Sequence, residues 1–176
     1  MDCKKLRHIF VLLLLAAGCL IPAGCRMSVS LTGSSIDARA KTVYIQTFRN
    51  NATLVNPTLS QQFTNALKDR IQSQTPLTIV DNKHNGDYSL EGSITGYSIR
   101  PVAIQGDETA AMNRLTITVS VSFTNKFDET QNFEQSFSRY ADYSSTQNFT
   151  SIESTLVEQI NEALTEDIFN KAFVNW

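Results

Sequence analysis

The chain has 176 residues, with 15 Lys and Arg against 17 Asp and Glu, which gives a formal net charge of −2. A chain with this balance lacks the basic face that a general nucleic-acid binder needs to displace counterions, so we expect no nucleic-acid partner. Its length is sufficient for one domain with its own hydrophobic core.

The N-terminus has the pattern of a bacterial lipoprotein signal peptide. Lys4, Lys5 and Arg7 precede an apolar run over residues 9–21, which is followed by small residues and a cysteine. The run is shorter than the roughly 20 apolar residues that a spanning helix needs. We therefore expect residues 1–24 to be a signal peptide that is removed, rather than a permanent transmembrane helix.

Two cysteines are candidates for lipidation. Cys25 follows Pro-Ala-Gly and leaves the whole apolar run to the export machinery, whereas Cys19 follows Ala-Ala-Gly and leaves a much shorter apolar segment. Neither has the usual Leu at the third position before it. Because the longer apolar segment is more typical of such signals, we favour Cys25 over Cys19. An uncleaved anchor or a plain secretory signal peptide is the alternative.

A lipidated Cys25 would tether the protein to a membrane and would be its only covalent addition, since no other cofactor is expected. Burial of an acyl chain in the membrane contributes about 0.8 kcal/mol per CH₂ group. Two or more such chains therefore anchor a protein stably. An aspartate directly after the cysteine commonly retains a lipoprotein at the inner membrane, and Arg26 stands there instead. We therefore expect an outer-membrane, lipid-anchored protein that faces the periplasm.

The mature chain divides into a tether and one domain. Removal of residues 1–24 takes away three basic residues and one acidic residue, which leaves 12 basic and 16 acidic residues and a formal charge of −4. Residues 25–40 are small and polar and should link the lipid to a single domain over 41–176. The mature chain has one cysteine, which the lipid occupies, so we expect neither a disulfide nor a thiol nucleophile.

The first half of the domain predicts a strand, a helix and a second strand. Apolar and polar residues alternate over 43–48. Asn56-Pro57 should then start a helix, because Asn can cap the free amides and Pro loses no hydrogen bond at the first helical position. The helix should end at Thr75-Pro76. After a short strand over 77–80, the pair Asn85-Gly86 favours a hairpin reversal.

The next strands are long and alternate clearly. From Tyr88 onward the apolar parity changes after Gly96, which predicts a bulge there, and Pro101 suggests that the end of this strand lies at a sheet edge. Over 115–123 every odd residue is apolar and every even residue is Ser or Thr, so one face should be buried and the other polar. The polar positions, which we expect to face a partner, are Thr116, Thr118, Ser120 and Ser122.

The last part of the chain predicts one more strand over 133–143 and a C-terminal helix. Thr150 and Glu153 have the spacing of a capping box, and apolar residues then recur every four positions. We therefore predict an α+β fold in which two amphipathic helices pack on one face of a mostly antiparallel four- to five-stranded sheet.

No pattern of catalytic or metal-binding residues is visible. His84, the single histidine after residue 24, falls in a polar turn, where a solvated role is expected. The adjacent pairs Asp107-Glu108 and Asp128-Glu129 fall in loops and should also be solvated. The chain has neither a Gly-x-Ser-x-Gly elbow nor a Gly-rich phosphate loop. We therefore predict a protein that is not an enzyme and holds no metal.

The segment 102–113 joins two long strands and is longer than a tight hairpin. Arg100 and Arg114 flank it and should lie near one end of the sheet. Guanidinium groups pair well with phosphate, so these two residues are the candidate contact to an anion. The alternative is that they only solubilise the strand ends.

Several segments together resemble one family. They are 30–36, 48–70, 90–97, 113–119 and 166–176. In combination they resemble the Bacteroidetes branch of LptE, a family of outer-membrane lipoproteins in lipopolysaccharide transport. The resemblance implies two helices on a four-stranded sheet, and it carries the lipidated cysteine onto Cys25, although Pro22 departs from the usual signal sequence.

The resemblance also implies partners. LptE proteins plug the lumen of the β-barrel protein LptD, assist its assembly and help deliver lipopolysaccharide to the cell surface. A polar Ser/Thr sheet face would suit a water-lined lumen. The alternative hypothesis is a periplasm-facing lipoprotein that regulates a cell-wall synthase or forms part of a secretion complex, and a hydrolase with an unrecognised site is the third.

Overall fold

The computed structural model describes residues 36–54, 56–102 and 111–174. They all belong to one compact unit, Gly33–Trp176. The predicted signal peptide and both candidate lipidation sites, Cys25 and Cys19, lie outside the described residues, as does most of the loop between Arg100 and Arg114. Among the described helices, none combines the length and the apolarity that crossing a membrane requires.

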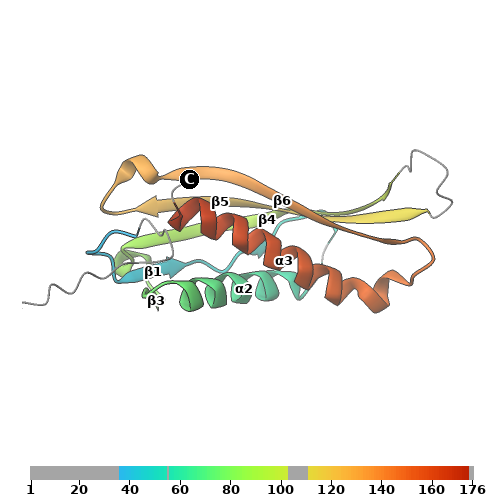
Figure 1. The fold of residues 1–176 in the computed structure, drawn as a ribbon, viewed down its shortest axis with the longest axis horizontal. Helices are drawn as coiled ribbons and strands as arrows, with labels where there is room; N and C mark the ends of the chain where they lie inside the picture. Colours follow the sequence, from blue (N-terminus) through green and yellow to red (C-terminus); the bar gives the residue numbers. More distant parts are fainter. Residues whose placement is uncertain (1–35, 55, 103–110, 175–176) are drawn as a thin grey trace, which may run out of the picture. The chain divides into compact units, whose positions relative to one another are not determined.

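The described chain forms a sheet and two long helices (Figure 1). In chain order the elements are β1 (Thr42–Ile45), β2 (Arg49–Asn50), α2 (Leu59–Gln74), β3 (Thr78–Val80), the 3-10 helix η1 (Lys83–Asn85), β4 (Tyr88–Val102), β5 (Met112–Asn125), the 3-10 helix η2 (Glu129–Gln131), β6 (Phe133–Ser144) and α3 (Phe149–Phe173).

The sheet is mixed rather than mostly antiparallel. Its order is β3-β1-β4-β5-β6, and β2 also pairs with β4, which makes six strands. The meander β4-β5-β6 is antiparallel as predicted, whereas β1 runs parallel to both β3 and β4. The reason for the parallel half is that α2 connects β1 to β3, and a helical crossover returns the chain in the same direction. The prediction of four to five mostly antiparallel strands is corrected accordingly.

The predicted hairpin at Asn85-Gly86 is wrong. Strands β3 and β4 lie on opposite sides of β1 and run parallel to it, so residues 81–87 cross over β1 instead of reversing the chain. Gly86 lies against the strand, because a Cβ added there would be 3.0 Å from the Cβ of Tyr44. The turn preference of Asn-Gly is a local effect, and pairing with the free edge of β1 outweighs it.

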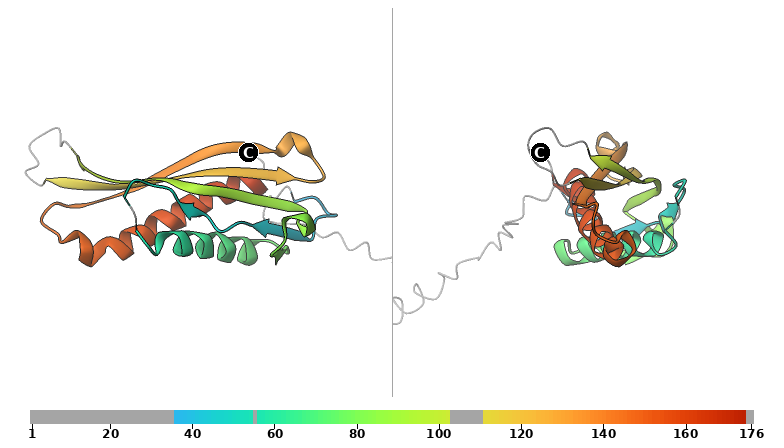
Figure 2. Two further views of the ribbon diagram at one scale, coloured as in Figure 1. Left: turned by 180° about the vertical axis from the view of Figure 1, so that it is seen from behind. Right: turned by 90° about the vertical axis from the view of Figure 1, so that its right-hand side faces the viewer.

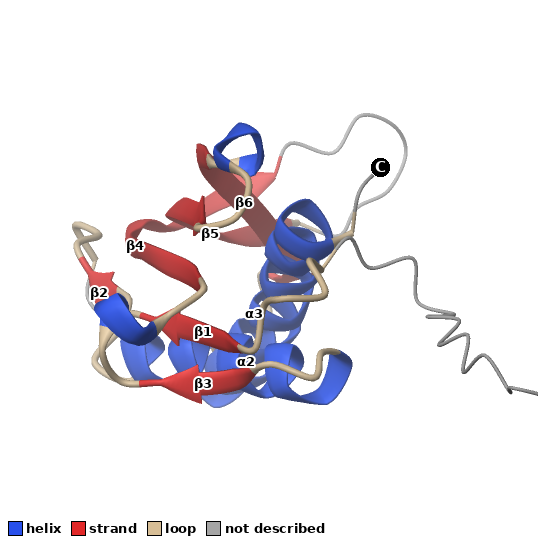
Figure 3. Ribbon diagram, turned by 90° about the vertical axis from the view of Figure 1, so that its left-hand side faces the viewer, coloured by secondary structure: helices blue, strands red, loops and turns tan. Residues whose placement is uncertain are grey.

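Both helices lie on one face of the sheet, as predicted, and the sheet curls around them (Figures 2 and 3). The apolar stripes of the helices and the odd-numbered positions of β5 are buried against each other. On α2 the stripe is Leu59, Phe63, Leu67 and Ile71, and on β5 it is Leu115, Ile117, Val119, Val121 and Phe123. On α3 it includes Leu156, Ile160, Leu164 and Ile168.

The helix starts differ in detail from the predictions. Oδ1 of Asn56 accepts hydrogen bonds from the amides of Thr58 (3.0 Å) and Leu59 (3.1 Å). The N-cap residue is nevertheless Thr58 and α2 begins at Leu59, so Pro57 does not occupy the first helical position as predicted. The capping box at Thr150 is wrong, because Asn148 caps α3 and its side chain accepts from the Thr150 amide. The carboxylate of Glu153 instead points across to another element.

That carboxylate ties the two layers together. Oε1 of Glu153 accepts a hydrogen bond from the Tyr97 hydroxyl at 2.6 Å and another from Nδ2 of Asn56 at 2.7 Å. Burial, followed by this hydrogen bond, raises the pKa of Tyr97. A residue of α3 thereby joins β4 to the start of α2, and we call these three residues the Glu153 clamp.

The bulge and the edge position in β4 are confirmed. The register with β5 shifts between Ile94 and Gly96. Beyond Ile94, β4 pairs only with β5 among the described strands. Pro101 has no N–H group, and no strand on the other side of β4 needs one at this position.

Two glycines of β4 differ in how much space surrounds them. A Cβ at Gly92 would lie 2.0 Å from the carbonyl oxygen of Ser120 and 2.7 Å from the ring of Phe48. Phe48 is fully buried and packs at 5.1 Å against the ring of Phe63. At Gly96 the nearest atom, Cβ of Thr118, would be 3.1 Å away.

We therefore predict that Gly92→Ala destabilises the protein more than Gly96→Ala does. The first change forces the sheet backbone and a core ring apart, for which overpacking costs of about 1–3 kcal/mol are typical. Urea unfolding of the two variants beside the wild type measures the difference. Equal stabilities for the two variants would contradict this account of Gly92.

Candidate functional site

The face of the sheet opposite the helices is lined by hydroxyl groups. The four predicted positions on β5 lie there, next to Ser residues of β4 and β6 that pair with them. We call this set the hydroxyl face, and it comprises Ser93, Ser98, Thr116, Thr118, Ser120, Ser122, Ser136 and Ser138. None of these residues is buried, and both helices lie on the other side of the sheet (Figure 2).

The hydroxyl face is uncharged and can both donate and accept hydrogen bonds. Within it, Oγ1 of Thr118 and Oγ of Ser138 lie 3.0 Å apart across β5 and β6. A hydroxyl offers one donor and two acceptor positions, so it can match many partner groups. Desolvation of a hydroxyl also costs much less than desolvation of a charge. The surface is therefore suited to contact another polar surface.

Arg100 and Arg114 are brought together as predicted. They are direct cross-strand partners on β4 and β5 at the end of the hydroxyl face. Arg114 is already engaged, because its guanidinium makes two hydrogen bonds to Asp142 at 2.7 and 2.8 Å. It also lies 3.6 Å from the ring centre of Tyr140, which is 55% exposed. Arg100 is exposed, and its role as an anion contact stays a prediction.

The sequence analysis did not identify Tyr140 and Asp142 as parts of this site. Their even-numbered positions on the predicted strand over 133–143 would have placed them on the same face as each other. What the pattern did not contain was the register that sets Asp142 directly opposite Arg114.

The opposite end of the face is also charged. Lys83 forms an ion pair with Glu91. Lys83 also lines a hollow of about 270 Å³ together with Ser89 and Lys126. His84 lies at its edge, in η1, and is exposed. A neutral central surface is thus bordered by charges at both ends and by the exposed Arg49 of β2, which pairs with Ser93.

The acidic pair Asp128-Glu129 has a structural explanation. Asp128 caps η2, because its carboxylate accepts hydrogen bonds from the amide and hydroxyl of Thr130 at 3.0 and 2.6 Å. The hydroxyl bond is the main cause that lowers the pKa of Asp128. The other pair, Asp107-Glu108, lies outside the described residues. Among residues that are described, no three His, Cys, Asp or Glu side chains are arranged to hold a metal ion.

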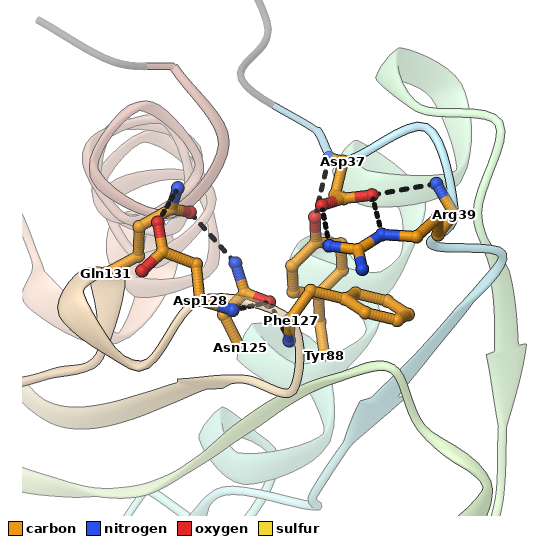
Figure 4. A network of polar contacts seen from close by, with 7 residues as sticks. All are labelled: Asp37, Arg39, Tyr88, Asn125, Phe127, Asp128 and Gln131. Carbon is orange, nitrogen blue, oxygen red and sulfur yellow. Dashed lines mark hydrogen bonds and ion pairs between the residues drawn. The ribbon is translucent and has the colours of Figure 1, made fainter.

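The segment before β1 is attached to the end of the sheet by a polar network (Figure 4). The Tyr88 hydroxyl accepts a hydrogen bond from the Asp37 amide at 3.0 Å. The side chain of Arg39 donates to both carboxylate oxygens of Asp37, which lowers the pKa of Asp37 to about 2. The guanidinium of Arg39 also lies 4.6 Å from the ring centre of Phe127. These contacts determine where the N-terminal segment enters the domain.

These features define a two-layer α+β domain with one sheet face left open and polar. The family model for LptE, described as lipopolysaccharide-assembly, matches residues 40–172. The chain therefore belongs to the LptE family, a family of non-enzymatic lipoproteins.

Solved structures share the fold. A minor lipoprotein from Acinetobacter baumannii is similar with a TM-score of 0.51 and 14% identity, over 75% of this chain and 91% of that one. A putative neuraminyllactose-binding hemagglutinin homolog from Helicobacter pylori is similar with a TM-score of 0.52 and 8% identity, over 80% and 87%. At these identities the likeness concerns the fold alone. Comparison with curated proteins gives no match.

The ion pair at the end of the hydroxyl face predicts a pH dependence. The hydrogen bonds from Arg114 lower the pKa of Asp142, so the pair stabilises the fold above the ordinary Asp pKa of about 3.9. This contribution is lost as the pH falls through the lowered pKa of the folded state.

We therefore expect Asp142→Asn to reduce the free energy of unfolding at pH 7 by less than about 1 kcal/mol, since the pair is partly exposed. The deficit should be smaller at pH 3, which lies below the ordinary Asp pKa of about 3.9. Urea unfolding at both pH values measures it, with Glu129→Gln as a control on an exposed acid. A deficit that is the same at both pH values would contradict the assignment.

Proposed function

We propose that the chain is an outer-membrane lipoprotein, anchored through Cys25, that plugs an LptD-like β-barrel and assists its assembly in lipopolysaccharide transport. Membership of the LptE family supports a role in lipopolysaccharide assembly. The observation that carries the proposal for the barrel is the open, uncharged hydroxyl face. No reacting group is needed for this role, which agrees with a protein that is not an enzyme.

The chemistry of the hydroxyl face suits a barrel lumen. The interior of a large outer-membrane barrel is polar and hydrated, and its wall alternates inward-facing polar side chains. Ser and Thr hydroxyls can replace hydrogen bonds to water by hydrogen bonds to such side chains at a low free-energy cost. Apolar residues at these positions would instead form an exposed apolar patch before assembly. We expect the contact with the barrel to be mostly polar.

The dimensions also agree. Strand β6 has 12 residues, which at about 3.3 Å per residue gives a length of roughly 40 Å. The apolar band of an outer-membrane barrel is about 25 Å tall. The hydroxyl positions of β5, from Thr116 to Ser122, span about 20 Å of this length, so the polar contact would cover most of the height of the band.

The proposal predicts site-specific crosslinks from the hydroxyl face. A photoreactive phenylalanine analogue at Ser120 should crosslink to a β-barrel protein in intact outer membranes, because Ser120 lies at the centre of the face. The same residue at Gln72, which is exposed on α2, is the position control. Crosslinked partners are identified by mass spectrometry.

A Ser120 crosslink to a cell-wall synthase or a secretion protein would reject the barrel and favour the alternative hypothesis. Depletion separates the same possibilities in cells. Loss of surface lipopolysaccharide supports the proposal, whereas altered cell shape with normal lipopolysaccharide contradicts it.

The proposal extends to the two arginines as a contact for lipopolysaccharide phosphates. Because Asp142 neutralises Arg114, Asp142→Asn should free a guanidinium opposite Arg100 and raise the affinity for purified lipopolysaccharide by about tenfold, as expected for one charge-assisted hydrogen bond. Arg100→Ala should lower the affinity. Binding is measured by titration in detergent, with Glu129→Gln as the control. Unchanged affinity in both site variants would reject this contact.

A further inference from the structure

Strand β6 forms one edge of the sheet, and its outer side has no partner strand among the described residues. It pairs with β5 in continuous register from Phe133 to Ser144, and the sheet order ends with it. An edge strand presents a row of free N–H and C=O groups, which proteins commonly protect with Pro, Lys, a bulge or a covering segment. Strand β6 contains no Pro, no Lys and no register shift. Its long, regular edge is therefore suited to pairing with a further strand.

The helix side of β6 is also incompletely covered. Its odd-numbered residues face the helices, since Phe137 and Ala141 are buried there, but Gln135 and Arg139 are exposed. A charge on the inner side of an edge strand can deter pairing. Here Arg139 makes two hydrogen bonds of 2.6 Å to the carboxylate of Asp167 on α3, so its charge is neutralised. The edge is thus open and carries no unpaired charge on this side.

One segment of the chain has the sequence of a strand that matches this edge. Residues 27–32, which lie outside the described residues, are Met-Ser-Val-Ser-Leu-Thr. Apolar and hydroxyl residues alternate in them, as they do over 115–123 of β5. Alternate side chains of a strand point to opposite faces of its sheet. In a paired strand, the three apolar side chains would face the helices and the three hydroxyls would continue the hydroxyl face.

The described chain begins at the end of the sheet where β6 starts (Figure 4). Ile36 packs against the core, and the Asp37 amide is held by the Tyr88 hydroxyl at 3.0 Å. Arg39 lies over the ring of Phe127, which comes just before η2, and η2 leads into β6. The segment that precedes residue 36 must therefore approach the domain at this end.

A hollow of about 330 Å³ lies at the same end, between η2, the first residue of β6 and the last turn of α3. Asp128, Phe133 and Lys171 are among the residues that line it. Residues 33–36 span at most roughly 15 Å when extended, which limits 27–32 to nearby edges. The opposite edge strand, β3, has only three residues, and the free part of β4 begins about 20 Å along the strand from Tyr88. The edge of β6 is the long edge that starts at the entry point.

We propose that residues 27–32 pair with the outer edge of β6 as an additional, antiparallel strand. The direction follows because the segment reaches its entry point at the start of β6, so it must run toward that start. Its backbone would satisfy the free edge, and its apolar side chains would cover Phe133 and the aliphatic part of Arg139. The preceding residue Cys25 would then lie toward the end of the sheet that carries Arg100 and Arg114. This inference concerns the sheet edge and does not depend on the proposed barrel contact.

Hydrogen exchange of the purified full-length lipoprotein, without any partner, tests the pairing. In an unpaired edge strand every second amide points outward and exchanges quickly. We expect slow exchange at consecutive amides in the first half of β6. Val29→Ser/Leu31→Ser removes two apolar contacts, so the outward amides should exchange at least about tenfold faster, while the amides of β5 report an intact fold. The matched control Ser28→Thr/Ser30→Thr keeps the alternation and should leave the exchange unchanged.

Cysteine pairs test which edge and which face the segment occupies. Opposite Cβ atoms of antiparallel strands are about 4.5–5.5 Å apart, close enough for a disulfide after small adjustments. Ser30→Cys should therefore form an internal disulfide with a cysteine at one of three positions on the hydroxyl side of β6, namely Glu134, Ser136 or Ser138. The controls are cysteines at Gln135, which is exposed on the helix side, and at Thr78, which is exposed on β3. Mass spectrometry of the linked peptides identifies the pairs.

Fast exchange at every second amide of wild-type β6 overturns the proposal, as does unchanged exchange in Val29→Ser/Leu31→Ser. Absence of a disulfide at all three positions, or equal yields at Gln135 or Thr78, also overturns it. A disulfide that joins two molecules would identify a second copy of the chain as the occupant instead. The Ser120 crosslink is measured separately, so its loss rejects the barrel contact alone.

Discussion

The odd-numbered side chains of β5, from Leu115 to Phe123, are exposed by no more than 1%, while the even-numbered ones remain partly exposed. A sheet satisfies its backbone hydrogen bonds within its own plane, so an apolar face can be stabilised only by another layer that covers it. Here α2 and α3 supply that layer. The positions of the loops and of both candidate surfaces follow from this burial of one face.

Covering one face leaves the other to water or to a partner. The hydroxyl face carries Ser and Thr at its centre. Charged residues stand at its two ends and at its edge, where Arg49 of β2 pairs with Ser93. This distribution keeps the open face soluble without a strong single-sign field. It also allows the face to lose its water at low cost when it meets a polar wall, which is the physical basis of the proposed role in the LptE family.

The two layers are joined by more than apolar contact. The Glu153 clamp connects α3 to Tyr97 of β4 and to Asn56 before α2, with hydrogen bonds of 2.6 and 2.7 Å. A hydrogen bond to a charged acceptor is stronger than one between neutral groups. The start of α3 is thereby held against the sheet, so the hydroxyl face and the helical layer belong to one connected framework.

Periodicity in the sequence was enough to predict both helices, the polar face of β5, the bulge before Gly96 and the proximity of Arg100 and Arg114. The resemblance to LptE rested on particular sequence segments and not on periodicity. The sequence alone misassigned the Asn85-Gly86 crossover, the parallel direction of β1 and β3, and the role of Glu153, and it did not show that Asp142 pairs with Arg114. The physical reason is that a local pattern indicates which side chains are buried, because burial follows the spacing of apolar residues along the chain. Strand direction and polar pairing depend instead on groups far apart in sequence, and only the packed tertiary structure brings those groups together.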